Sequence, residues 1–135
     1  MNLKATASFR SGDTTRALAN IGVRVKAAIT NGANAVLDIS RQYVPVRTGK
    51  LASSGGVEVD VQGTKIIGTI SYTASYAAYN EFGTGKRGAA SGHGAPGIEY
   101  DPNWPGMPGH PYIRPALDAG RPQVLGAFAD QGFKT

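Results

Sequence analysis

The chain has 135 residues, a formal net charge of +5 and no cysteine. This length is that of one domain, and the absence of cysteine excludes disulfide frameworks, zinc–thiolate sites and thiol nucleophiles. No apolar run approaches the roughly 20 residues of a membrane-spanning helix, and residues 1–10 lack the apolar core of a signal peptide. We therefore expect a soluble protein that is made in a cytoplasm and has no membrane partner.

The positive charge is concentrated in residues 10–50, which hold seven basic residues and two acidic ones. Such a segment is suited to contact DNA or an acidic protein partner. A run of charges is nevertheless more often the solvated face of a helix. The sequence leaves both interpretations open.

The N-terminal third of the chain predicts a strand and a long helix. Apolar residues alternate with polar or small ones from Leu3 to Phe9, which favours a short strand. Residues 11–14 offer side-chain oxygens that can cap a helix. From about Thr14 to Tyr43 the apolar residues recur every three, four or seven positions and form one stripe of a helix. Pro45 should end this helix, because its ring disfavours helical geometry at the preceding residue.

The middle of the chain predicts an antiparallel hairpin. Valines alternate with acidic residues over 55–61, and a second strand is expected over 64–72. The intervening Gln62-Gly63 pair suits a tight turn, since glycine adopts positive φ without steric cost. A third strand is expected over 77–82.

Residues 83–111 have a different composition, with Gly or Pro at 13 of 29 positions. That content argues against a helix or a central strand, so we expect an extended loop over 83–110. The loop carries the only tryptophan, Trp104. We expect it to be poorly ordered in the free subunit and ordered by a neighbour. A final helix is predicted over 115–128, which Pro122 either interrupts or divides.

The sequence contains no convincing enzyme motif. Residues 83–87 resemble a phosphate-binding loop only superficially, because Asn80 and Arg87 stand where that motif needs Gly and Ser or Thr. His93 and His110 lack the helical spacing of metal ligands and lie among glycines. No serine lies in a Gly-x-Ser-x-Gly elbow. We therefore expect no enzyme, no cofactor and no metal.

Three short segments are more informative when taken together in order: a first motif (residues 43–51, YVPVRTGKL), a second motif (residues 76–84, YAAYNEFGT) and a third motif (residues 111–117, PYIRPAL). They resemble the head–tail joining family of tailed double-stranded-DNA bacteriophages, also called neck, tail-component or tail-completion proteins. The resemblance covers about residues 14–130. Tyr112 replaces the more usual Phe, and the 83–110 loop is longer than is typical of the family.

The resemblance implies a single α+β domain over 1–135, with an antiparallel sheet of three to four strands packed on one long N-terminal helix and a shorter C-terminal helix. It implies a structural virion subunit at the head–tail junction, present in the host cytoplasm during assembly. Such subunits form a homomeric ring, for which we favour sixfold over twelvefold symmetry. The ring joins connector and tail proteins, and the genome passes through it without sequence recognition. The alternative function is a small basic nucleic-acid-binding module.

Two groups of residues carry these expectations. The motif residues expected to maintain the fold are Pro45, Thr48, Gly49, Leu51, Tyr76, Phe82, Gly83, Thr84, Pro111 and Pro115. The residues expected to contact a neighbouring subunit or partner are Tyr79, Glu81, Tyr100, Trp104 and Arg114. We also predict a salt bridge between Glu81 and Arg114; the alternative is that Glu81 faces solvent or a neighbour.

Overall fold

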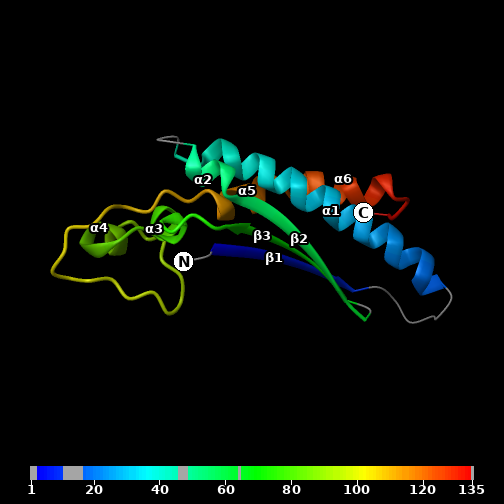
Figure 1. Ribbon diagram of the computed structural model, residues 1–135, viewed down its shortest axis with the longest axis horizontal. Helices are drawn as coiled ribbons and strands as arrows, with labels where there is room; N and C mark the ends of the chain where they lie inside the picture. The colour runs from blue at the N-terminus through cyan, green and yellow to red at the C-terminus, as the bar shows by residue number, and fades with distance from the viewer. Residues whose placement is uncertain (1–2, 11–16, 46–48, 64, 135) are drawn as a thin grey trace.

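The computed structural model describes residues 3–10, 17–45, 49–63 and 65–134 and confirms the α+β class (Figure 1). The predicted helix cap at 11–14 and the motif residue Thr48 lie outside the described residues. In chain order the elements are β1 (Leu3–Arg10), α1 (Ala17–Tyr43), α2 (Lys50–Ser53), β2 (Gly55–Gln62), β3 (Lys65–Tyr72), α3 (Ala77–Phe82), α4 (Gly85–Ala90), α5 (Ile113–Ala119) and α6 (Arg121–Asp130).

The long helix α1 follows the predicted apolar stripe. Its last backbone bond runs from the Val44 N–H to the Ser40 carbonyl, at 3.2 Å, and Pro45 has no N–H with which to continue. At the C-terminal end of the stripe Tyr43 is 47% exposed, while the neighbouring Val44 is buried. The buried apolar residues of the stripe include Val25, Ile29 and Val36.

The sheet has the strand order β1-β3-β2, and both pairings are antiparallel. The predicted hairpin is confirmed: Gln62 pairs with Lys65, and Gly63 turns the chain with a φ of 61°. Alternate residues of β3 are buried beneath α1. Among them Gly68 allows a close approach, since a Cβ there would lie 2.7 Å from Cγ2 of Ile29.

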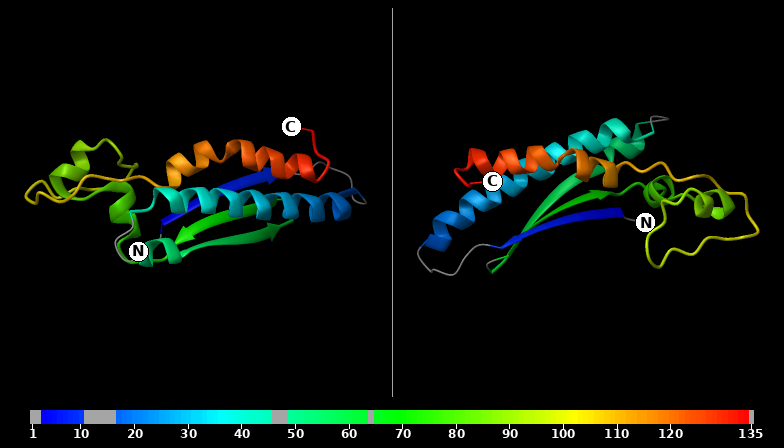
Figure 2. Two further views of the ribbon diagram at one scale, coloured as in Figure 1. Left: turned by 90° about the horizontal axis from the view of Figure 1, so that it is seen from above. Right: turned by 180° about the vertical axis from the view of Figure 1, so that it is seen from behind.

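Two further helices complete the helical layer. In Figures 1 and 2, α5 and α6 lie beside α1, and the sheet lies below α1. The predicted helix over 115–128 is therefore two helices, because the chain bends at Gly120 and Pro122 begins α6 in its first turn. α6 approaches α1 closely at Gly32, where a Cβ would lie 3.3 Å from Val124. Within the described residues, no helix combines the length and apolar character needed to cross a membrane.

The predicted third strand over 77–82 is wrong, because these residues form helix α3. Its backbone bonds follow the helical pattern: the Asn80 N–H donates to the Tyr76 carbonyl and the Gly83 N–H to the Tyr79 carbonyl. Ala77, Ala78 and Glu81 are buried while Tyr79 is exposed, which is a helical and not an alternating pattern. The two alanines favour the helix over the strand.

Residues 83–111 form an extension that projects beyond one end of the sheet and helices (Figure 1). The expectation that this segment holds no helix is wrong, because α4 lies within it. α4 forms despite its glycines since Gly85 and Gly88 are buried where the chain packs tightly on itself. A Cβ on Gly88 would lie 2.6 Å from the backbone of Gly83, so only glycine fits there.

Candidate functional site

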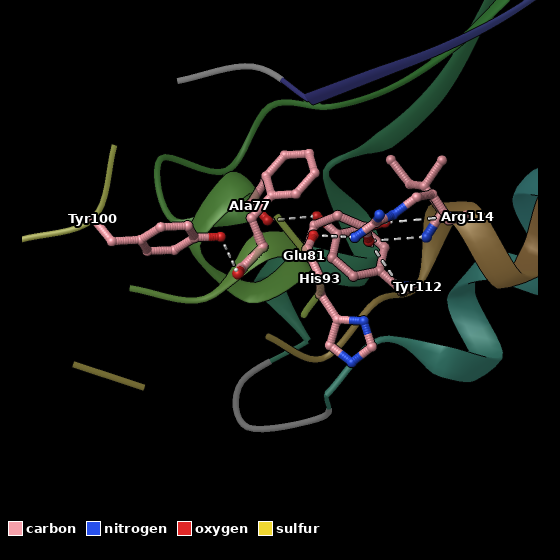
Figure 3. Close-up of polar contacts among 8 residues, drawn as sticks. Ala77, Glu81, His93, Tyr100, Tyr112 and Arg114 are labelled. Atoms are coloured by element: carbon pink, nitrogen blue, oxygen red, sulfur yellow. Dashed lines mark hydrogen bonds and ion pairs between the residues drawn. The ribbon is translucent and has the colours of Figure 1, made fainter. Parts of the chain in front are cut away.

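The carboxylate of Glu81 lies where α3, α5 and the extension meet, and Glu81 is 1% exposed. One oxygen accepts the N–H groups of Tyr112, at 2.7 Å, and of Ile113, at 3.1 Å. The other accepts the Arg114 N–H at 3.3 Å. These N–H groups begin α5 and have no partner within it, so the carboxylate satisfies them and complements the positive end of that helix (Figure 3).

Arg114 confirms the predicted salt bridge, since its Nε lies 3.3 Å from the Glu81 carboxylate. The pairing uses one guanidinium nitrogen and not two, because Nη2 donates to the carbonyl of His93 in the extension. The guanidinium also lies 5.4 Å from the ring centre of Phe82. Arg114 thus connects α5 to α3 and to the extension, while its side chain stays 45% exposed. We call Glu81, Arg114 and Tyr112 the Glu81 joint.

Tyr112 extends the joint into the core. Its hydroxyl donates to the Ala77 carbonyl at 2.8 Å, and its ring meets Tyr72 edge-on with centres 4.9 Å apart. The Tyr72 hydroxyl in turn lies 2.5 Å from the Ser40 hydroxyl of α1. Burial raises the pKa of both Tyr72 and Tyr112 above the ordinary value, because a phenolate would be desolvated there. Tyr112 therefore adds to this position a hydrogen bond that Phe cannot make.

Hydrogen bonds join the two ends of the extension to each other and tie it to α3. Thr84 and Met107 form an isolated β-bridge, with N–H to carbonyl distances of 2.8 and 3.0 Å. The Tyr100 hydroxyl donates to the Phe82 carbonyl at 2.9 Å (Figure 3). Gly106 is required where the returning chain passes Thr84, because its φ is +62° and a Cβ would lie 1.9 Å from the Thr84 carbonyl oxygen.

A groove of about 830 Å³ lies where the first and second motifs meet the returning arm of the extension. We call it the motif groove. Tyr76, which caps α3, and Tyr79 of α3 line it and are exposed. The other described residues that line it are Pro45, Gly49, Lys50, Leu51, Asn80, Met107 and His110.

A second groove, of about 510 Å³, lies between α3 and the far side of the extension. We call it the acidic groove, because Glu99 and Asp101 are its only charged lining residues in the described chain. Its aromatic lining residues are Tyr79, Phe82, Tyr100 and Trp104, of which Trp104 is 52% and Tyr79 45% exposed. Gly83 and Thr84 also contribute.

The structure separates the five predicted contact residues into two sets. Tyr79, Tyr100 and Trp104 come together in the acidic groove. Glu81 and Arg114 instead bind each other in the joint. Pro111 and Pro115 flank the N–H groups that Glu81 accepts, so the third motif serves to start α5. In the described ranges no three acidic or histidine side chains gather as a metal site would require.

The sequence did not reveal the backbone donors of α5, the His93 carbonyl or the Tyr112 hydroxyl as partners in the joint. The only available signal was Tyr at a position where the family usually has Phe. Backbone groups carry no signature of their own in a sequence, because every residue except proline has an N–H.

Two arginines of the basic segment hold the chain's own parts together. Arg24 donates from Nε to the Gln131 carbonyl at 2.7 Å and lies 4.6 Å from the ring centre of Phe133. Arg41 pairs with Asp38 at 3.3 Å and donates to the Gly55 carbonyl. These contacts make Arg24 and Arg41 poor candidates for binding DNA phosphates and so weaken the nucleic-acid-binding alternative.

The described chain packs a long helix on a three-stranded antiparallel sheet, and its buried Glu81, Tyr112 and Ser40 side chains bond to the chain's own helices. The profile of the family described as "Bacteriophage HK97-gp10, putative tail-component" matches residues 13–83, just over half of the chain. The chain belongs to this family and is a bacteriophage tail component. The match contains the first motif and all of the second except Thr84, while most of the extension, α5 and α6 lie beyond it. No curated protein and no solved structure matched the chain.

Proposed function

We propose that the chain forms a homomeric ring at the head–tail junction of the virion, sixfold in preference to twelvefold. The ring joins the capsid connector to the tail. It surrounds a channel through which the genome passes without sequence recognition. The family membership supports the assignment to the tail, and the three motifs support the narrower placement at the junction.

The extension is the observation that carries this proposal. It leaves the body of the subunit at one end (Figure 1). Trp104 of the extension is exposed, and so is Tyr79 of the adjoining α3. Large exposed aromatic residues are enriched among those that dominate protein–protein binding. A cyclic ring requires two different complementary surfaces on each subunit, and a projecting arm at one end is suited to supply one of them.

The deciding experiment removes the gene for this chain from its phage and images the products by electron microscopy. We expect filled or empty heads and separate tails, with joining restored when the wild-type chain is supplied from a plasmid. Cryo-electron microscopy of the restored particles should then show several copies of the chain around the channel. Particles that join normally without the chain, or that contain one asymmetric copy, would contradict the proposal.

A further inference from the structure

The acidic groove has the chemistry of a site for a cation next to an apolar side chain. Glu99 and Asp101 supply negative charge, and no basic residue is among the lining residues in the described chain. Trp104 and Tyr79 present exposed ring surface. Aromatic faces attract cations, and nearby carboxylates strengthen that attraction. The same negative charge disfavours nucleic acid as an occupant.

The wall of the acidic groove is held in place before anything binds. The carbonyl of Trp104 accepts the Lys86 N–H at 2.9 Å, and a Cβ on Gly85 would lie 2.4 Å from that carbonyl oxygen. Tyr100 is fixed by its bond to the Phe82 carbonyl. A preformed wall lowers the ordering cost of binding, so even a small contact area can contribute affinity.

A matching surface lies on α1. Val23 is 71% exposed, the most exposed large apolar side chain of the described chain, and exposed Lys26 follows three positions later on the same helix face. We call this pair the Val23–Lys26 ridge. No hydrogen bond or ion pair of the Lys26 ammonium occurs in the part of the chain that the structure describes. Residues 17–37 contain no acidic residue that would oppose a negatively charged partner.

The ridge and the acidic groove lie at opposite ends of the subunit. Figures 1 and 2 show the extension at one end of the long axis and the start of α1 at the other. One subunit cannot bring its own two surfaces together in this fold. Neighbouring copies can, if they are arranged head to tail, and such contacts between unlike surfaces are those that close a ring.

We propose that the acidic groove of each subunit binds the Val23–Lys26 ridge of the next copy. Val23 packs against Trp104, and the Lys26 ammonium lies beside Asp101 and Glu99. The proposal rests on the ring proposed above and names its subunit contact. α6 offers a competing pair, Arg121 and Leu125, both exposed. It is less suitable because exposed Asp118, close to Arg121 in the chain, has the same sign of charge as the acidic groove.

Cross-linking tests this contact cleanly, because the chain has no cysteine. Particles are assembled from Lys26→Cys/Asp101→Cys subunits and treated with a short bismaleimide. Each subunit should join to the next on both sides, which produces a ladder of covalent multimers up to the ring number. Each single-cysteine variant should stop at a dimer or below. The matched control, Arg121→Cys/Asp101→Cys, should give no ladder.

The outcomes separate the two proposals. A ladder from the Arg121→Cys pair, or no ladder from particles in which microscopy shows the ring, overturns the acidic-groove contact and leaves the ring standing. Wild-type particles without a multi-copy ring overturn both. Multimers that link the Asp101→Cys site to another tail protein instead of this chain also overturn the contact.

A charge exchange provides the second readout. Asp101→Lys or Lys26→Asp alone should weaken the contact roughly tenfold or more, which corresponds to about 1.4 kcal/mol, and should lower the yield of joined particles. The two changes together should restore most of that yield. Both side chains are exposed, so circular dichroism should show a wild-type fold in each variant. A double variant no better than either single one contradicts the pairing.

Discussion

Replacing Glu81 by Gln tests whether the hydrogen bonds between α3 and the start of α5 stabilise the fold. The carboxylate accepts four bonds, from the N–H groups of Tyr112, Ile113 and Arg114 and from the Arg114 guanidinium. Glutamine has the same shape but presents one acceptor oxygen and one NH₂ group. Whichever way the amide points, two donors lose their acceptor and face another donor instead.

The cost follows from burial. The amide should place its NH₂ toward Arg114, whose side chain is 45% exposed, and keep its oxygen on the buried N–H groups of Tyr112 and Ile113. A buried donor without a partner costs roughly 1–3 kcal/mol, and water recovers part of this at the exposed guanidinium. We expect the free energy of unfolding to fall by about 2–3 kcal/mol. For a domain of this size that lowers Tm by roughly 10 °C.

The assay is thermal and urea unfolding followed by circular dichroism, with Asp38→Asn as the matched control. The Asp38–Arg41 pair has the same 3.3 Å separation, but its side chains are 72% and 41% exposed. Removing that exposed pair should cost less than about 1 kcal/mol. Arg114→Lys, alone and combined with Glu81→Gln, then measures the coupling between the two side chains through their non-additivity.

The reasoning fails if Glu81→Gln melts within a degree or two of wild type, or if it loses no more stability than Asp38→Asn. Either result would mean that the N–H groups of α5 find other partners at no cost. Strict additivity with Arg114→Lys would show that the salt bridge contributes nothing beyond the backbone bonds.

Three further predictions concern packing, pH and the extension. Gly68→Ala should destabilise the fold by roughly 1–3 kcal/mol in urea unfolding, because its Cβ would lie 2.7 Å from Ile29, whereas Gly56→Ala meets no neighbour within 4 Å and should not. The raised pKa values of Tyr72 and Tyr112 mean that the folded state keeps protons that the unfolded state releases, so stability is full below the unfolded value of 10.0 and falls above it. Urea unfolding below and above pH 10.0 should show that the free energy of unfolding falls less in Tyr112→Phe than in the wild type. Replacing residues 86–105 by two glycines should preserve the fold, because Gly85 and Gly106 are already adjacent, but abolish joined particles in complementation; normal joining would refute a role for the extension in assembly.

The elements that the sequence predicts well are those whose pattern is local. α1 and β3 each bury one face, and β2 partly buries alternate residues, so the period of the apolar residues identifies the element. The segment over 77–82 is too short for its period to separate a strand from a helix. Its helical form depends on burying Ala77, Ala78 and Glu81 together, which is a tertiary requirement that no local pattern contains.

A high glycine content favours disorder, whereas several glycines of the extension lie in close packing. Gly83, Gly88 and Gly106 lie where backbone meets backbone, with no room for a Cβ. Composition alone cannot distinguish a glycine in a flexible segment from a glycine at a close backbone contact, because the lack of a side chain serves both purposes. The acidic groove was missed for the same reason, since its shape follows from these contacts.

The Glu81 joint explains why the second and third motifs occur together although the extension separates them. The carboxylate of the second motif binds mainly the N–H groups of the third, which any residue except proline supplies at the start of a helix. Among the described donors to that carboxylate, only Arg114 contributes a side chain. The intervening segment leaves from Gly83 and returns beside it at Gly109, so a longer segment can still place Glu81 against the N–H groups of α5. Loop closure becomes only slowly less favourable with length. An extension longer than is typical of the family is therefore compatible with the same fold, and the extension is the place where such a subunit can acquire a new contact without rebuilding its core.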